Sequence, residues 1–381
     1  MGLSRRKVML GGLGALGLIG AGGYLKLKPK PIVLGFVADP DVVIRAKALI
    51  AKVQSFDLHA HPGRTFATGA SDLKGIIKLY TLMGSFEDKA VADMRAGGMN
   101  CVTFCTVADL QILEVVKGKG LSTWREFEPG EAWESHKRQM GNLKALAQSG
   151  LVTAVFNTSD ITKARAAGEI ACLYGAEGGD FLGGSVERLR ETYEDGLRVI
   201  NPIHYHHNEL GDMMTAAPKH GGLTDAGIAI IKEMNRLGMV IDGAHASLDS
   251  LSGMLDISDK PIICSHTHIL SDKMPNMPRF ITKDLAKRIA EGGGIIGGWP
   301  AGLGINTMDG FISRILELVD SVGIDHVGFG TDMDANYKPV WDDYADFPLV
   351  VTALMQRGMH DDEIAKIIGG NAMRVMAAVT G

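Results

Sequence analysis

The chain has 381 residues, of which 46% are hydrophobic, so one barrel-sized domain or two ordinary domains could each bury an adequate core. Its formal net charge of -5 comes from interspersed acidic and basic residues. Without a basic stripe for a phosphate backbone, we expect no nucleic-acid partner. The cysteines lie in apolar segments rather than in a paired framework or a zinc knuckle, which predicts small buried core residues at Cys101, Cys105, Cys172 and Cys264.

The first 30 residues have the layout of an export signal. A basic start, Ser4-Arg5-Arg6-Lys7, precedes a run of uncharged residues, 8–25. The Arg5-Arg6 pair predicts a twin-arginine signal, which would suit an enzyme that takes up metal before it is exported folded. The alternative is an uncleaved membrane anchor, because the run is just long enough to span a bilayer and has no clear A-x-A cleavage site. Under both interpretations the rest of the chain is periplasmic or exported, and the second adds a membrane association.

Beyond the signal, short apolar runs alternate with longer helical patterns. This alternation is typical of β/α units around a parallel sheet, and we expect one α/β domain over residues 40–381, a (β/α)8 TIM-type barrel. Nine strands are predicted, one more than a barrel needs, and the strand at Thr153 is the one expected to lie at an edge or outside the barrel. The predicted strands are Phe56–His61, Cys101–Val107, Thr153–Asn157, Ile170–Glu177, Val199–His204, Val240–His245, Ile262–His266, Ile295–Trp299 and Val327–Asp332. Helices are predicted over Val186–Leu197, Asp225–Leu237, Lys283–Glu291 and Asp361–Ala378.

Six of the predicted strands end in a side chain that can bind a metal or transfer a proton. Because a (β/α)8 barrel assembles its active site at the C-terminal ends of its strands, these residues are expected to meet at one mouth. A half-buried histidine or a helix cap would explain any one of them alone. It does not explain why five of the chain's 12 histidines lie at strand ends. The residues are His59, His61, Glu177, His204, His245, His266 and Asp332.

The residue types predict a two-metal centre. His59 and His61 lie two residues apart on one face of a strand, so both can bind one ion. Glu177 can bridge two ions, and His245 and His266 would complete the shell of the second. Zinc is the default for mixed histidine and carboxylate ligands, although manganese or iron could occupy the same shell.

The predicted chemistry is hydrolysis at that centre. Two zinc ions roughly 3.5–4 Å apart can generate a bridging hydroxide at neutral pH and polarise a scissile carbonyl. Asp332 can take a proton from that hydroxide and hand it to the departing amine.

Five segments resemble the membrane (renal) dipeptidase family, zinc metallopeptidases of the amidohydrolase-like barrel group. The resemblance extends from about residue 55 to the C-terminus, with the segments in the order found in the family, and the interval from His245 to His266 also matches. The segments are Arg198–His204 with Asn208 and Asp212 beyond it, Gly221–Gly227, Glu233–Asp242, Gly323–Asp332 and Ile367–Asn371.

The resemblance implies a zinc-dependent hydrolase that cleaves the amide bond of dipeptides or dipeptide-like substrates, and a homodimer. Asp332 would be the catalytic acid and base, and His204 would steady the substrate carbonyl and the oxyanion. Asp212 and Asn371 would be structural. The metal ligands that the family implies are His59, Glu177, His245 and His266.

Two positions depart from the family pattern. The family usually has aspartate where this chain has His61, so metal binding should survive with one fewer negative charge and a more acidic bound water. The arginine that clamps the substrate carboxylate in the dipeptidases aligns with Pro275, and Arg279 is the nearest substitute as a substrate-binding residue. His206, His207 and His268 lie near the same mouth and either contact substrate or cap loops.

Two other functions stay open at this point. A lactonase or another amidohydrolase acting on a non-peptide amide or ester would use the same metal pair with a different clamp. A non-enzymatic metal-binding protein of the cell envelope would need the ligands, but it would not need Asp332 at the mouth.

Overall fold

The computed structural model describes residues 32–117, 120–272, 274 and 276–381, and Leu34–Gly381 form one compact unit. The export signal predicted for residues 1–30 lies outside the described residues. None of the helices in the described ranges combines the length and the apolar character needed to span a membrane.

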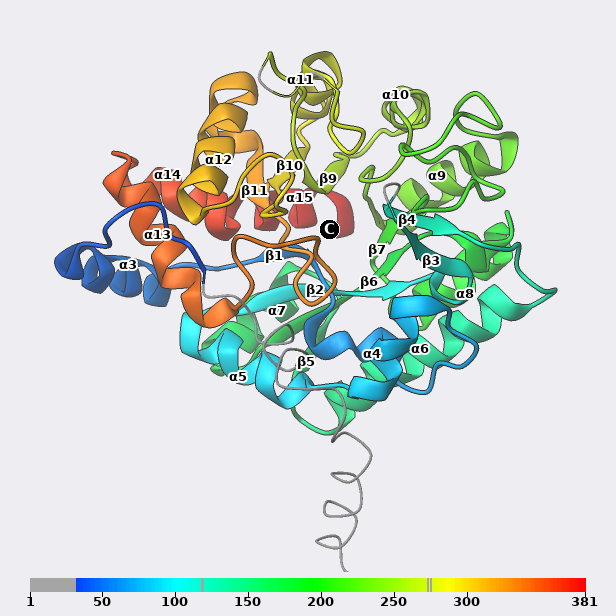
Figure 1. The fold of residues 1–381 in the computed structure, drawn as a ribbon, viewed down its shortest axis with the longest axis horizontal. Helices are drawn as coiled ribbons and strands as arrows, with labels where there is room; N and C mark the ends of the chain where they lie inside the picture. Colours follow the sequence, from blue (N-terminus) through cyan, green and yellow to red (C-terminus); the bar gives the residue numbers. More distant parts are fainter. Residues whose placement is uncertain (1–31, 118–119, 273, 275) are drawn as a thin grey trace, which may run out of the picture. The chain divides into compact units, whose positions relative to one another are not determined.

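Eight parallel strands form the barrel that the sequence predicts, and Figure 1 shows them in the middle of this unit with the helices around them. They are arranged in two hydrogen-bonded sheets, in the orders β1-β2-β6-β7-β8 and β9-β10-β11. The strands are β1 (Asp57–Ala60), β2 (Cys101–Val107), β6 (Ala171–Glu177), β7 (Val199–Asn201), β8 (Val240–Ile241), β9 (Ile263–Thr267), β10 (Ile295–Gly298) and β11 (Val327–Phe329).

Backbone hydrogen bonds close the barrel at both seams between the two sheets. At the β8–β9 seam, Gly243 N–H donates to the carbonyl of Ile263 at 2.7 Å. At the β1–β11 seam, Asp332 N–H donates to the carbonyl of His59 at 2.9 Å, and His61 N–H donates to that of Met333 at 3.0 Å.

The ninth predicted strand, β5 (Thr153–Val155), is present but lies outside the ring. It pairs with the first half of β6, from Ala171 to Leu173, and β7 pairs with the second half of the same edge. The expectation of an extra strand at Thr153 is therefore confirmed.

The helices follow the predicted rhythm, and most of the larger ones begin at a side-chain cap. Thr224 accepts a hydrogen bond from Gly227 N–H at the start of α9, and Gly238, at φ 73°, ends that helix in the left-handed conformation that glycine favours. The helix predicted from Val186 ends at Glu194, three residues early. The larger helices are α3 (Pro40–Lys52), α5 (Glu87–Gly97), α6 (Glu131–Gln148), α7 (Thr158–Ala166), α8 (Val186–Glu194), α9 (Asp225–Leu237), α10 (Leu248–Ile257), α11 (Lys283–Glu291), α12 (Met308–Val322) and α13 (Phe347–Gln356).

The single helix predicted over Asp361–Ala378 is wrong, because the chain is interrupted by a π-type turn at Lys366–Gly370 between α14 (Asp361–Ala365) and α15 (Asn371–Thr380). At the turn, the carbonyl of Ile368 leaves the helical ladder and accepts a hydrogen bond from Phe56 N–H at 2.8 Å. The break thus joins the last helical segment to the entry of β1.

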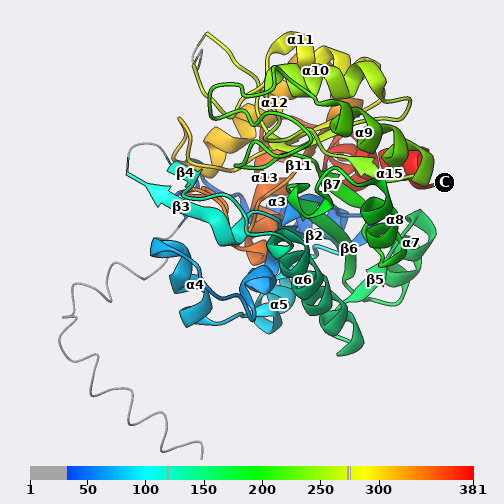
Figure 2. The ribbon, with the colours of Figure 1, turned by 90° about the vertical axis from the view of Figure 1, so that its right-hand side faces the viewer.

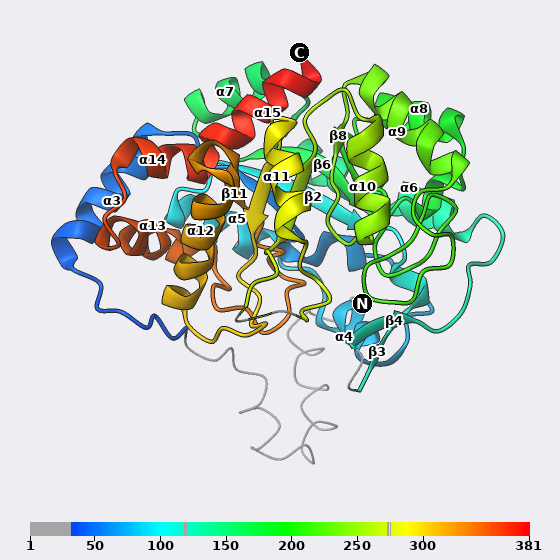
Figure 3. The same cartoon turned by 90° about the horizontal axis from the view of Figure 1, so that it is seen from above.

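A small subdomain of short elements follows β1 and β2, and the sequence patterns did not predict it. It consists of η1 (Pro62–Ala67), η2 (Gly75–Ile77), α4 (Lys78–Met83), η3 (Leu110–Ile112) and an antiparallel hairpin of β3 (Leu113–Val116) and β4 (Gly120–Thr123). Figures 2 and 3 show the hairpin beside α4 on one face of the unit. Their apolar side chains form a cluster of their own around Phe66, Ile77 and Leu113.

Candidate metal centre and active site

The predicted metal ligands of β1 and β6 meet at the C-terminal mouth of the barrel. His59 and His61 Nε2 lie 3.2 Å apart, as alternation along a strand requires for side chains on one face. Glu177, the last residue of β6, brings Oε1 to 3.4 Å from His59 Nε2 and Oε2 to 3.3 Å from His61 Nε2. After it, Gly178 at φ 95° turns the chain away where a side chain would collide with Ala108.

The histidines after β8 and within β9 face the other side of the same carboxylate. Oε1 of Glu177 lies 3.0 Å from His245 Nε2 and 3.5 Å from His266 Nε2. The two ring nitrogens are 2.9 Å apart. Glu177 therefore lies between two pairs of imidazoles, which is the position expected of a bridging carboxylate.

The donor atoms are spaced as ligands of metal ions would be. Metal–nitrogen bonds of about 2.0–2.1 Å in a tetrahedral shell hold neighbouring donors roughly 3.3 Å apart. The separations among the Nε2 and carboxylate oxygen atoms here run from 2.9 to 3.5 Å. Among the described residues, three buried groups meet the geometric requirement for holding an ion. They are His59 with His61 and Asp332, Glu177 with His245 and His266, and His59 with Asp242 and His266.

Second contacts orient the imidazoles so that Nε2 points inward. The carbonyl of Cys105 can only accept, so His61 must donate Nδ1–H to it, at 3.0 Å, which leaves the lone pair of Nε2 for the centre. Nδ1 of His59 lies 3.3 Å from Cys105 Sγ, and Nδ1 of His266 lies 2.8 Å from Ser265 Oγ. The prediction that Cys105 is a buried free thiol is confirmed, as it is for the other three cysteines, but Cys105 also supports the site.

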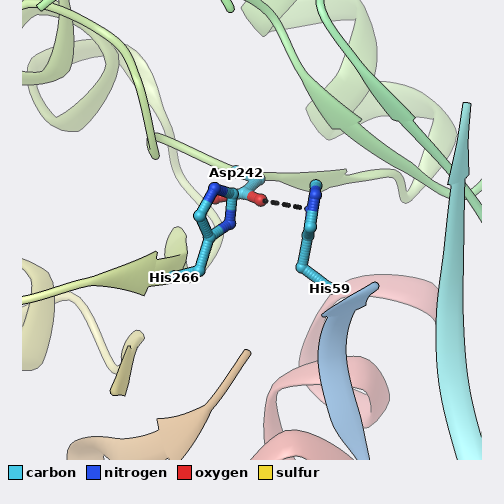
Figure 4. Close-up of side chains that lie close together, drawn as sticks. All are labelled: His59, Asp242 and His266. Carbon is cyan, nitrogen blue, oxygen red and sulfur yellow. Dashed lines mark ion pairs between the residues drawn. The ribbon is translucent and has the colours of Figure 1, made fainter. Parts of the chain in front are cut away.

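Asp242 lies beside His59 and His266 and was not predicted as a site residue. Its carboxylate faces the rings of His59 and His266, with Oδ2 3.9 Å from His59 Nδ1 (Figure 4). Ala244 and Ser265 N–H donate to its other oxygen. Asp242 directly follows β8, so the rule that picked out the other strand ends could also have found it.

His204 lies at the centre as predicted, and a second missed carboxylate holds it. Nδ1 of His204 is 2.7 Å from Asp109 Oδ1, and its Nε2 is 3.3 Å from Glu177 Oε2. Burial opposes the charged imidazole, but Asp109 and Glu177 outweigh burial and raise the pKa of His204. Asp109 follows β2 by two residues, which is again a strand-end signal.

Asp332 completes the group, and its backbone is strained. It adopts φ 54°, in the left-handed region that residues other than glycine rarely occupy, and His245 does the same at φ 67°. Oδ1 of Asp332 lies 3.5 Å from His61 Nε2. Burial, followed by the charge of Glu177, raises the pKa of Asp332 to about 6.

Arg279, predicted as the substitute for the family's arginine, reaches the same centre. Position 275, with which the family's arginine aligns, lies outside the described residues. Nη2 of Arg279 is 2.9 Å from His245 Nε2, and its guanidinium stands 5.0 Å from the centre of the Trp299 ring. The side chain is only 4% exposed, yet Nε and Nη1 have no hydrogen-bond partner among the described residues. The indole N–H of Trp299 has none either, so unpaired donors gather beside the metal ligands.

The other three histidines near the mouth are held by carboxylates away from the centre. His206 contacts Asp180 at 2.7 Å, His207 contacts Asp212 at 2.9 Å, and His268 contacts Glu317 at 3.0 Å. Of the two interpretations open for them, these contacts favour the fixing of loops.

Fold and site together define a barrel hydrolase of the metal-binding type, with an inward-facing histidine and carboxylate cluster at the C-terminal mouth. The family model described as membrane dipeptidase (peptidase family M19) matches residues 45–381, and the chain belongs to this family. The family and the buried groups of ligand atoms together show that the centre depends on metal.

Relatives and solved structures agree with the assignment. The chain is 33% identical over 229 residues to dipeptidase verJ of Clonostachys rogersoniana, a match that covers 58% of each protein. The chain therefore spans little more than half the length of this curated relative. In fold it is similar to the probable dipeptidase PvdM of Pseudomonas aeruginosa, with a TM-score of 0.72, 20% identity, and 90% and 99% of the two chains covered. A metallopeptidase of Rhodobacter sphaeroides, bound to a phosphinate mimic of L-Ala-D-Ala, has a TM-score of 0.72 at 18% identity over 86% and 99% of the chains.

Proposed function

We propose that the protein is a zinc-dependent dipeptidase with two ions. His59 and His61 would hold one ion, His245 and His266 the other, and Glu177 would bridge them. The observation that carries the proposal is the position of Glu177 between two imidazole pairs, within 3.0–3.5 Å of all four Nε2 atoms. When bound, the ions would activate water at neutral pH and polarise the substrate carbonyl.

The remaining groups would move protons and stabilise charge. Asp332 would accept a proton from the attacking water and deliver it to the nitrogen of the scissile amide as the C–N bond breaks. His204, oriented by Asp109 at 2.7 Å, would donate Nε2–H to the carbonyl oxygen as negative charge develops there.

Arg279 would hold the free carboxylate of the substrate. A buried guanidinium whose Nε and Nη1 have no partner among the described residues is suited to bind a carboxylate, because a carboxylate accepts from two such donors at once. Trp299 would add its unpaired indole N–H. This pair would replace the arginine that the family carries at the position of Pro275.

Hydrolysis by purified zinc-loaded protein tests the proposal. A panel of dipeptides, including some with D-configured C-terminal residues, is compared with lactones and non-peptide amides, and bound zinc is counted by elemental analysis. We expect dipeptide turnover with two zinc ions per chain. Glu177→Gln should lose zinc, and Asp332→Asn should lower kcat by about 10²–10⁴-fold, while exposed Asp320→Asn on α12 should change neither. Turnover of lactones without any turnover of dipeptides would show that the substrate class is wrong. Fewer than one zinc per chain would contradict the two-ion centre, and two bound zinc ions without turnover of any substrate would favour a non-enzymatic metal-binding protein.

We also propose that the chain is exported through its first 30 residues and acts as a homodimer in or near the cell envelope. The support for export is the Arg5-Arg6 pair followed by an uncharged run, and the support for a dimer is the family resemblance.

A further inference from the structure

A cavity of about 220 Å³ opens above the candidate metal centre. Its floor contains the reactive groups, among them Glu177, His204 and Asp332. One apolar wall comes from the small subdomain, through the hairpin β3–β4, η1, η2 and α4, and the loops after β7 and β11 add Tyr205 and Tyr337. Figure 2 shows these elements together beside the barrel.

Strand alternation directs the apolar residues of the hairpin into this cavity. Leu113 and Val115 lie two residues apart on β3, and Val115 is paired in register with Leu121 of β4. All three line the cavity. The residue between the first two, Glu114, forms an ion pair with Lys74 at 2.9 Å instead.

The walls carry no charge of their own. The opposite side is built from Phe66, Ile77 and Tyr80, and Glu177 and Asp332 of the floor are the only carboxylates among the described lining residues. Arg64 of the subdomain lies over the Tyr80 ring and donates Nε–H to the carbonyl of Asp334 at 2.9 Å. Uncharged hydrogen-bonding side chains line the cavity elsewhere, on Tyr80, Tyr205, Asn336 and Tyr337. At the hairpin wall of Leu113, Val115 and Leu121, a charged or hydrogen-bonding substrate group would lose its water without gaining a side-chain partner.

Apolar surface is also left uncovered at the rim. Val115 is 51% exposed and Tyr337 is 52% exposed, and both line the cavity. Large apolar side chains at the mouth of a cavity with a polar floor are typical of a binding site. We therefore expect an apolar group of the substrate to cover Val115 and Tyr337 while the substrate amide is held at the floor.

We propose that the substrate is a dipeptide with a bulky apolar side chain, aliphatic or aromatic, and that the β3–β4 hairpin selects it. The inference rests on the proposed function, because the floor must hold the amide for the walls to contact its substituent. Val115, Leu113 and Leu121 are then specificity-determining residues rather than catalytic ones.

Binding of non-hydrolysable analogues tests this selection without requiring turnover. A set of phosphinate dipeptide analogues carries a Leu, Asn or Ala side chain at the first position, and a second set carries the same side chains at the second position. Calorimetry measures the Kd of each analogue for the zinc-loaded protein. At one of the positions we expect the Leu analogue to bind about 10–200-fold more tightly than the similarly sized Asn analogue, which is the discrimination that apolar pockets achieve.

Two variants locate the selection on the hairpin. Val115→Asp places a charge in the exposed part of the wall and should reduce the Leu preference several-fold, while the Ala analogue should bind nearly as before. Val37→Asp makes the same change at a residue that is 86% exposed and does not line the cavity, and it should leave all Kd values unchanged. Melting temperatures check that both variants are folded, and Tyr337→Ser provides a second change at the rim.

Equal Kd values for the Leu and Asn analogues at both positions would overturn the inference, as would a Leu preference that survives in Val115→Asp and in Tyr337→Ser. Hydrolysis is scored separately on the same protein. Absence of dipeptide turnover together with selective binding of the Leu analogue would contradict the proposed function and leave the selectivity of the cavity standing.

Discussion

At the scale of single residues, one buried carboxylate fixes the loop between β7 and α9. Asp212 is fully buried, and its two oxygens accept hydrogen bonds from the backbone N–H groups of Lys219, His220, Gly221 and Gly222 at 2.7–3.0 Å. Although burial opposes the charge, these donors hold the pKa of Asp212 below its ordinary value. The structural role that the family resemblance implies for this residue has this physical basis.

Replacing Asp212 by Asn should destabilise the metal-free protein by roughly 2–4 kcal/mol at pH 7, because an amide NH₂ would face N–H donors that the carboxylate now satisfies. Since the folded pKa of Asp212 lies below the unfolded value of about 3.9, its contribution is fully present above about pH 5. It is lost as the pH falls through the unfolded value towards the folded one. Urea unfolding at pH 7, 5 and 3.5 measures the difference between wild type and variant.

The comparison needs a matched variant on the surface. Asp259→Asn changes an exposed carboxylate and should stay within about 0.5 kcal/mol of wild type at each pH. A deficit of Asp212→Asn that did not shrink between pH 5 and pH 3.5 would show that the carboxylate charge is not what holds the loop.

The sequence predicted the residues of the metal centre better than it predicted their supports. His59, Glu177 and His266 were found because each ends an apolar run, and the barrel brings strand ends together. Asp109 carries the strand-end signal, but its contact with His204, like that of Cys105 with His59, depends on how neighbouring strands are aligned. That register is set by long-range pairing and not by either segment alone.

At the scale of elements, the break between α14 and α15 is required by a close approach of two backbones. A Cβ on Gly369 would lie 2.1 Å from the carbonyl oxygen of Gln54, just before β1. Helix α15 buries Val375, Met376 and Val379 in the core cluster that also contains residues of the barrel strands. This cluster is separate from the one around Phe66 in the small subdomain.

Gly369→Ala should therefore destabilise the protein by about 1–3 kcal/mol, the usual cost of forcing atoms into a closely packed region. Gly141→Ala is the matched change, because a Cβ at this position of α6 meets nothing within 4 Å. It should stabilise the protein by about 0.5–1 kcal/mol, since alanine favours a helix interior. Thermal and urea unfolding of the two variants measure both effects, and a neutral Gly369→Ala would mean that the contact with Gln54 relaxes freely.

Hydrophobic periodicity predicted the strands and most helices, but it could not predict where regular structure gives way to the site. Val240–His245 was expected to be one strand, whereas β8 ends at Ile241 and His245 adopts φ 67°. The positive φ of His245 is imposed by the packing around it. Hydrophobic periodicity indicates only which side chains are buried, so it cannot predict this backbone angle. The hairpin β3–β4 was missed because its short strands pack on a satellite cluster and not on the barrel.

At the scale of the whole described unit, the candidate ligands lie at the two seams of the barrel. His59, His61 and Asp332 flank the β1–β11 seam, and His245 and His266 flank the β8–β9 seam. These are the places where the ladders of the two sheets are interrupted, and only a few backbone hydrogen bonds cross them. Ions bound between the ligand pairs would therefore connect the two sheets in addition to supplying chemistry.

Metal binding should for this reason stabilise the entire barrel. A ligand that binds only the folded protein, at 100 times its Kd, adds about 2.7 kcal/mol. For a chain of this size such a gain corresponds to roughly 3–4 °C in Tm. We expect chelation to lower the Tm by at least this amount and added zinc to restore it, as measured by calorimetry. Glu177→Gln should lose most of the response, because the carboxylate contacts ligands at both seams. Asp320→Asn should keep it. A Tm that is the same with and without zinc would mean that the ligand cluster does not join the sheets.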